Sequence, residues 1–330
     1  MSIPELPDGF FARRPTVDDA PDIHELVAAR DTAAIGVPDA TVEDIADELA
    51  EPDFDLGADG WLVEDPGGRL VGWGWACRKG RSDNVDIEVC VRPGAEAIAP
   101  WLWATALHRS TEIARALGHP RAVVDIGIYR AAEAQRSEAQ SRGFSPATTF
   151  HRLRIDQSGP RTAPEPPAGV TVRSDSDDES LRRTAHRVYQ ESFAEHFGFV
   201  PKSYEQWAAE IEASSTLDWS MATVAEVDGV PAALLFTGDQ FVADENCGYI
   251  FLLAVLPEYR GMGLARFLLS LAFSHDAAKA RSGTILHVDT ENTTPALGLY
   301  LSAGMRPVLV IDVWRRVVPI DQTRQQRSGA

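Results

Sequence analysis

The stretch YIFLLAVLPEYRGMGLARFLLSLAF, residues 249–273, changes character in its middle. An apolar run of strand length stops at Pro257, and an apolar run with helical periodicity follows a few residues later. Between the two runs stand Arg260, Gly261 and Gly263. Glycine weakens both strands and helices, so its presence at this junction indicates a backbone geometry or a ligand that requires it.

A turn of this kind at the start of a helix is suited to bind phosphate. The first four backbone N–H groups of a helix lack intrahelical partners, and the helix dipole places partial positive charge there. Glycines let the backbone approach a ligand closely, and the guanidinium of Arg260 can donate two parallel hydrogen bonds to phosphate oxygens. The P-loop lysine and the third glycine of the dinucleotide-binding fingerprint are both missing, so neither of those motifs is present.

The chain repeats one plan at an offset of about 160 residues. GFFARRPTVDD begins at Gly9 and GVTVRSDSDDE at Gly169, and each predicts a short strand, an acidic helix start and a helix. A β-hairpin, a strand stopped by proline and a long helix follow in both halves. The Pro-rich segment 156–167 reads as a linker, so we expect two similar α/β domains, 1–155 and 168–330.

Charge and composition exclude several classes of protein. The net charge of −18 argues against nucleic acid and anionic membranes, and is compatible with a cationic acceptor. No apolar stretch approaches the ~20 residues of a membrane span, and the N-terminus is unlike a signal peptide, so we expect a cytoplasmic protein. The three widely spaced cysteines form no metal or disulfide motif and are expected to be buried apolar residues.

Two motifs together resemble a known family. Arg260, Gly263 and Ala265 match R-x-x-G-x-A, and HVDTENTTPALGLYLSAGM (287–305) gives strand, asparagine, helix, tyrosine and a glycine–apolar pair. This pair resembles the acetyl-CoA site of the GCN5-related N-acetyltransferases (GNAT), closely over 168–318 and weakly over 9–155. The resemblance implies mixed, mostly antiparallel sheets flanked by helices. It also implies direct transfer of an acetyl group from acetyl-CoA to an amine in a ternary complex, with no metal.

The resemblance also assigns roles to residues of the second half. The backbone of Leu253, Ala254 and Val255 would pair with the pantetheine arm, and Tyr300 would protonate the leaving thiolate. Asn292 matches the family asparagine that faces the pantetheine. The pyrophosphate would be held by the loop that comprises Arg260, Gly261, Met262, Gly263, Leu264, Ala265 and Arg266.

The general base is harder to assign. Tyr249 occupies the position at which mycothiol synthase-like members of the family carry a glutamate. We expect Glu245, just upstream, to take its place, although a solvated loop carboxylate is the alternative reading. His287 can line the acceptor pocket, act as base or be a packed core histidine. The other carboxylates near these strand ends are Asp244, Asp289 and Glu291.

The acceptor is expected to be a small molecule that carries an amine. The aromatic segment around Phe197 and Phe199 precedes a predicted helix and is a candidate acceptor loop, or a loop packed on the core. Because the tandem arrangement most resembles mycothiol synthases, acetylation of a cysteinyl pseudodisaccharide is an alternative. A non-catalytic acyl-CoA sensor and a longer acyl donor also stay open, as does the choice between monomer and homodimer.

The first half lacks the chemical residues of the second. Its loop GAEAIAPWLW (94–103) has no R-G-x-G, and Pro100 stands where the helix should begin. The counterparts of the asparagine and the tyrosine are Ala131 and Ala139. We therefore expect 1–155 to be a degenerate, non-catalytic domain, although its strand at 89–91 can still hold a pantetheine-like arm.

Overall fold

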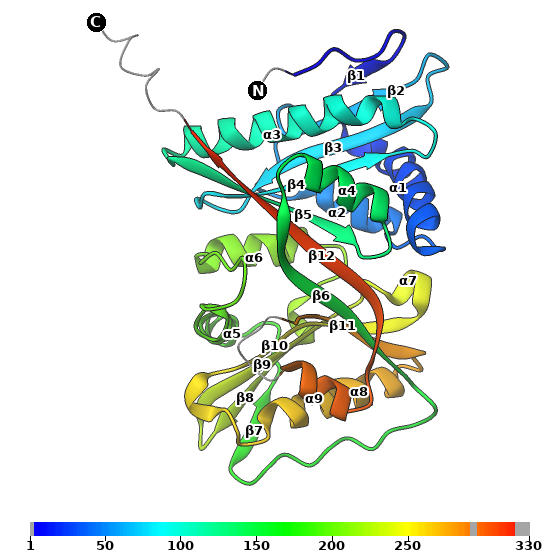
Figure 1. The fold of residues 1–330 in the computed structure, drawn as a ribbon. Coiled ribbons are helices and arrows are strands. Elements are labelled where there is room, and N and C mark those ends of the chain that lie inside the picture. Colours follow the sequence, from blue (N-terminus) through cyan, green and yellow to red (C-terminus); the bar gives the residue numbers. More distant parts are fainter. Residues whose placement is uncertain (1–2, 291–295, 321–330) are drawn as a thin grey trace, which may run out of the picture. The chain divides into compact units, whose positions relative to one another are not determined.

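The computed structural model describes residues 3–290 and 296–320. They form two compact units: one comprises the chain up to Ala147 and from Ile311 onward, and the other comprises Thr148–Val310. Each unit holds a mixed sheet with helices packed on it, which confirms the predicted α/β class (Figure 1).

The first unit is a sheet in the order β1-β2-β3-β4-β5-β12, in which only β4 and β5 are parallel. Its strands are β1 (Phe11–Arg13), β2 (Gly60–Glu64), β3 (Leu70–Arg78), β4 (Asn84–Val91), β5 (Arg121–Tyr129) and, from Ile311, β12 (Arg306–Pro319). Its helices are α1 (Ala20–Ile35), α2 (Val42–Ala50), α3 (Ala99–Ala116), α4 (Glu133–Ser141) and the 3-10 turns Val17–Asp19 and Glu96–Ile98.

Alternating side chains give this sheet two buried faces. On one face Val63 and Val89 pack in a core cluster with α3. On the other face Leu62 and Trp73 pack in a cluster with α1 and α2. Because helices cover both faces, both are apolar. The sequences of these strands are therefore nearly continuous apolar runs.

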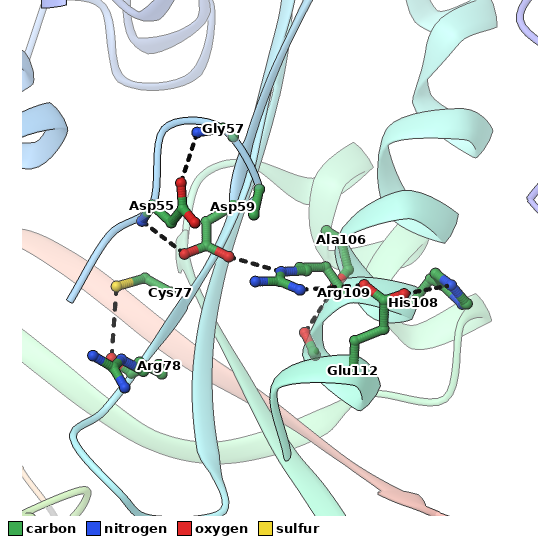
Figure 2. Close-up of polar contacts among 12 residues, drawn as sticks. Asp55, Gly57, Asp59, Cys77, Arg78, Ala106, His108, Arg109 and Glu112 are labelled. Carbon is green, nitrogen blue, oxygen red and sulfur yellow. Dashed lines mark hydrogen bonds and ion pairs between the residues drawn. The ribbon is translucent and has the colours of Figure 1, made fainter. Parts of the chain in front are cut away.

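A buried carboxylate ties the loop before β2 to helix α3. Figure 2 shows Asp59 accepting a hydrogen bond from Arg109 Nε at 2.7 Å and one from the backbone N–H of Asp55 at 2.8 Å. Arg109 also contacts Glu112 at 3.3 Å, one turn further along the helix. A buried charge paired in this way fixes the loop against the helix. We therefore assign the cluster a structural role.

The second unit is a sheet in the order β6-β11-β10-β9-β8-β7, in which β10 and β11 are parallel. Its strands are β6 (Ser145–Asp156, from Thr148), β7 (Val170–Arg173), β8 (Ala222–Val227), β9 (Val230–Gly238), β10 (Cys247–Val255) and β11 (Gly283–Asp289). Its helices are α5 (Glu179–Phe193), α6 (Tyr204–Ala213), α7 (Val242–Glu245), α8 (Leu264–Ala278), α9 (Ala296–Ser302) and the 3-10 turns Trp219–Met221 and Pro257–Tyr259.

The second sheet is covered in the same manner. Leu235 and Ile250 pack in a cluster with α8 on one face, whereas Leu234 and Phe236 pack with α5 and α6 on the other. Cys247 and Cys90 are buried free thiols, as expected of small apolar residues, whereas Cys77 is only half-buried.

The boundary between the units differs from the expected 1–155 and 168–330, because the last strand of each repeat belongs to the other unit. Strand β6 lies along β11, with Leu153 opposite Leu286, and β12 lies along β5, with Trp314 opposite Ile126. The Pro-rich segment 156–167 joins β6 to β7, and both of these strands belong to the second unit for all or most of their length. It is therefore a loop of that unit instead of a linker between two units.

One buried acid at the end of α8 makes the stability of the second unit depend on pH. Asp276 accepts a hydrogen bond from Thr284 Oγ1 at 2.6 Å, and it lies so close to Gly248 that a Cβ there would fall 2.0 Å from its Oδ1. Burial raises the pKa of Asp276 from 3.8 to about 6, although Thr284, Lys279 and Arg281 oppose the shift. The folded protein thus favours the protonated carboxyl.

We expect Asp276→Asn to remove a pH-dependent loss of stability. Below pH 4 the acid is protonated in both the folded and the unfolded chain. As pH rises through 6 the wild type loses on the order of 3 kcal/mol of unfolding free energy at this site, which asparagine does not lose. Urea unfolding of both proteins between pH 4 and 7 measures the difference. A difference that does not grow with pH would contradict this account.

Candidate functional site

A cavity of about 470 Å³ opens in the second unit where two parallel strands diverge. Strands β10 and β11 pair only from Cys247 to Ile250, opposite Gly283 to Leu286. Beyond these pairs both strands continue, and their last residues line the cavity. The opening therefore presents the ends of two strands to a ligand.

The glycine loop closes one end of this cavity. Gly261 and Gly263 line it with positive φ angles of 82° and 81°, which L-residues other than glycine rarely adopt. Gly263 is the N-cap of α8, and no side chain caps this helix start. A Cβ at either glycine would meet nothing within 4 Å, so the space before the loop is open. Unpartnered backbone N–H groups and the helix dipole thus face an empty region.

The charge around the loop is positive. Arg260 and Arg266 both line the cavity, and the first turn of α8 holds no acidic residue. Arg260 Nε donates to the carbonyl oxygen of Val255 at 3.3 Å, and Arg266 donates to Ser302 Oγ at 2.7 Å. Leu264 and Ala265 complete the lining of this end. The arrangement fits a polyanion such as a pyrophosphate.

Strand β10 presents one edge to the cavity. Leu253, Ala254 and Val255 line it, while the strand pairs with β9 on its other side. The ladder slips at Phe251, between Ile250 and Leu252, and such a bulge re-aims the backbone locally. These residues are therefore placed to pair with an extended ligand.

Tyr300 stands in the same cavity. Its side chain is 8% exposed and packs in the core cluster with α8, and its hydroxyl hydrogen-bonds to no other described residue. Burial raises the pKa of Tyr300 to about 12, so the phenol keeps its proton throughout the neutral range. A protonated donor is thus held beside the strand ends.

One of the predicted cofactor-binding residues does not line the cavity, and another lies outside the described residues. Met262 belongs to the loop but its side chain is exposed to solvent. Asn292 falls outside the described residues, so its prediction rests on the motif alone.

The structure does not bring Glu245 to the cavity. Its carboxylate is bound by Arg154, and Arg152 Nη1 lies 3.9 Å from it. Both arginines come from β6, the strand contributed by the first repeat. Glu245 is thus placed in an ion-pair network with strand β6, and it is absent from the residues that line the cavity.

His287 lines the cavity, and its two ring nitrogens are engaged. Arg152 Nε lies 3.2 Å from His287 Nε2, and Tyr249 Oη lies 3.1 Å from His287 Nδ1. A guanidinium only donates, so Nε2 accepts and Nδ1 must carry the proton of a neutral ring. His287 is therefore oriented as a wall of the site, and its basic lone pair is taken by Arg152. Tyr249 completes this network.

Residues at the end of α5 and just after it line the cavity, whereas the aromatic residues predicted for the acceptor loop do not. Ser192, Phe193 and His196 line the cavity, whereas Phe197 and Phe199 do not. Asp289, at the end of β11, lines it as well. The sequence named Asp289 only among several carboxylates, and gave no signal for Ser192.

In the first unit the same regions are closed by its own side chains. The carboxylate of Glu96 accepts from the backbone N–H of Gly94 at 2.8 Å, in the loop that corresponds to the glycine loop. Gln135 donates to the carbonyl oxygen of Val89 at 3.3 Å, and the N–H of Val89 donates to Glu88 at 2.9 Å. Both polar backbone groups of Val89 are thus already bonded.

Comparison with known proteins agrees with these observations. The acetyltransferase (GNAT) family matches residues 181–305. A mycothiol acetyltransferase of Frankia alni is 28% identical over 300 residues, which cover 84% of this chain and 86% of the relative. A mycothiol acetyltransferase of Streptomyces bingchenggensis is 26% identical, over 74% of this chain and 76% of the relative.

Solved structures share the fold of the whole chain. A GCN5-related N-acetyltransferase from Sphaerobacter thermophilus superposes with a TM-score of 0.79 at 23% identity, covering 96% of this chain and 98% of its own. A tandem GNAT protein from the clavulanic acid biosynthesis pathway gives a TM-score of 0.70 at 17% identity, over 94% and 100%. The two-domain arrangement predicted from the repeat is therefore a known one.

Two further observations concern the described residues only. None of their helices is long and apolar enough to cross a membrane. No group of three or more histidine, cysteine or acidic side chains among them is arranged to hold a metal ion. Together with the motifs, these comparisons show an N-acetyltransferase: residues 181–305 match the GNAT family, and the fold is that of tandem GNAT proteins.

Proposed function

We propose that the cavity of the second unit transfers an acetyl group from acetyl-CoA directly to the amine of a small-molecule acceptor. One observation carries the proposal: the glycine loop at the start of α8 and the buried phenol of Tyr300 line the same cavity. A sensor of acyl-CoA would need the loop but not the proton donor, so their presence together favours turnover.

The binding of acetyl-CoA follows from the shape of the site. Backbone N–H groups from Arg260 to Ala265 would hold the pyrophosphate. The pantetheine arm would lie along Leu253, Ala254 and Val255 as an extra strand, because this edge of β10 faces the cavity. The thioester would then reach the point where β10 and β11 part.

The transfer itself needs three contributions. A backbone N–H of β10 beside the thioester would polarise its carbonyl, and one such donor contributes roughly 3–4 kcal/mol to the stability of the transition state. The amine attacks the carbonyl carbon, the C–N bond forms and the C–S bond breaks. Tyr300 donates its proton to the departing thiolate, since burial keeps the phenol protonated.

We assign the first unit a non-catalytic role. Glu96 occupies an N–H of its would-be phosphate loop and adds a negative charge there. Gln135 and Glu88 occupy the backbone of Val89, where a pantetheine arm would pair. The loop of this unit also lacks the R-G-x-G pattern of the second unit, so the first unit serves as support.

Acetylation of a mycothiol-type acceptor is the second candidate. The curated relatives that match most of the chain are named mycothiol acetyltransferases, at 26% and 28% identity. In such enzymes we expect a glutamate at the position of Tyr249. In this chain Tyr249 contacts His287 instead, so the acceptor region differs at this position. Assay of a cysteinyl glucosamine–inositol acceptor beside a panel of simple amines separates the two candidates.

The proposal predicts that Gly263→Val weakens acetyl-CoA binding. Valine at a φ of 81° is strained by about 1–2 kcal/mol, and relief of this strain would move the N–H groups of the loop, so we expect Kd to rise at least about tenfold. Calorimetric titration of acetyl-CoA measures the affinity, and thiol detection of released CoA on the amine panel measures turnover.

Gly229→Val is the matched control for this variant. Gly229 has a φ of 79° in the turn between β8 and β9, with nothing within 4 Å of a Cβ, and it does not line the cavity. Equal losses of affinity in both variants would contradict a binding role for the loop. Tight acetyl-CoA binding by the wild type without CoA release on any amine would favour the sensor.

A further inference from the structure

The cavity is lined by a carboxylate and a hydroxyl to which the acetyl-CoA binding proposed above gives no role. Asp289 is 8% exposed, and among the described residues that line the cavity it is the only acid. Ser192 is 6% exposed, and its Oγ has no hydrogen-bond partner in the described part of the chain. A buried hydroxyl left unpaired costs about 1–3 kcal/mol, so the site indicates a polar ligand group here.

The carboxylate is held in place by its neighbours. Thr148, itself buried, donates its hydroxyl to Asp289 Oδ1. A carboxylate has about four acceptor positions and can accept from several donors at once. Asp289 ends β11, one of the two strands that diverge to form the cavity.

The neighbouring histidine adds no positive charge to this end of the site. Burial lowers the pKa of His196 below 6.5, and the influence of Asp289 opposes that shift only in part. The imidazole is therefore neutral at neutral pH. The negative charge of Asp289 thus faces the acceptor beside a neutral ring.

The walls around these polar groups are apolar. Phe150, Phe193 and Phe251 line the cavity together with Val288. A sugar-like acceptor would leave several hydroxyl groups unsatisfied against such walls, at a cost for each one. A cation carried on an apolar body matches both the carboxylate and the walls.

We infer that Asp289 and Ser192 form the amine subsite, in which Asp289 takes the first proton of the acceptor, and that the acceptor is a primary alkylamine on an aromatic-sized apolar body. The inference rests on the proposed N-acetyltransferase function. A carboxylate in contact with the ammonium can accept its proton before the amine attacks.

The protons balance as follows. The ammonium gives one proton to the Asp289 carboxylate, which releases it to solvent after turnover. The free amine attacks the thioester, and the C–N bond forms as the C–S bond breaks. The nitrogen loses its second proton, which replaces the one that Tyr300 gives to the thiolate. The products are the amide, CoA thiol and one proton.

The test compares benzylamine, an ammonium at neutral pH, with aniline, which is already a neutral amine. Asp289→Asn is expected to lower kcat/KM for benzylamine by about 100-fold and for aniline by less than about fivefold. Ser192→Ala is expected to cost about fivefold with benzylamine. Glu245→Gln, the base expected from sequence, should show no such selectivity.

A binding measurement keeps the inference testable without turnover. Calorimetry on the protein saturated with CoA is expected to show tighter binding of benzylamine than of benzyl alcohol, and Asp289→Asn should remove this preference. Equal binding of the two by the wild type would overturn the inference, as would full benzylamine turnover in Asp289→Asn. Failure of the proposed function would give a different result: neither the wild type nor any variant would release CoA from acetyl-CoA with any amine.

Discussion

Tyr300→Phe is expected to lower kcat for CoA release by about 100- to 1,000-fold while the Kd for acetyl-CoA changes little. The phenol lines the cavity and is buried, so phenylalanine fills the same space and loses only the proton donor. Its hydroxyl bonds to no other described residue, so the change leaves no protein group unpaired.

The pH dependence gives a second readout for Tyr300. Because burial raises its pKa to about 12, the donor stays protonated across the neutral and mildly alkaline range. We expect kcat of the wild type to show no decline up to about pH 10 from this group. Tyr204→Phe, in α6 and outside the cavity, is the matched control. Wild-type turnover in Tyr300→Phe would remove this residue from the mechanism.

Trp314→Ala is expected to destabilise the first unit by about 3–5 kcal/mol, although the residue lies near the end of the second repeat. Trp314 is 7% exposed on β12 and packs in the core cluster beneath α3. Its indole N–H has no partner in the described part of the chain, so the loss is one of packing.

Hydrogen exchange locates the effect. Peptides from β4 and β5 should exchange faster in Trp314→Ala, because β12 pairs with β5. Val317→Ala is the matched control on the same strand, since Val317 is 51% exposed. Faster exchange in β10 and β11, with β5 unchanged, would mean that the strand belongs to the other sheet.

The sequence was most informative where the chemistry is local. Arg260, Gly261 and Gly263 lie within four residues, and the positive φ angles of both glycines are what a nest at a helix start requires. Tyr300 follows from a motif on a single helix. The loop and the phenol were therefore predictable, and the structure places them in one cavity.

The assignment of the base depended on contacts that are distant in sequence. Arg152 and Arg154 contact Glu245 because β6 pairs with β11 in the second sheet. No local sequence pattern predicts which sheet a strand will join. The alternation of apolar residues predicts β6 and β12 as strands but leaves their partners open. Asp289 lies on β11, which also carries the candidate His287, so its place in the cavity could only be seen in three dimensions.

Because β12 is the last strand to be synthesised, one edge of β5 stays unpaired during much of the synthesis of the chain. Tyr129 pairs with Ile311, which is made 182 residues later. At a synthesis rate of about 5–20 residues per second, this edge of β5 stays unpaired for roughly 10–40 s after the strand has left the ribosome. An open edge is a template for pairing with other chains. Nascent chains, and any fragment that ends before Ile311, should therefore depend on chaperones, whereas a finished chain closes the edge itself.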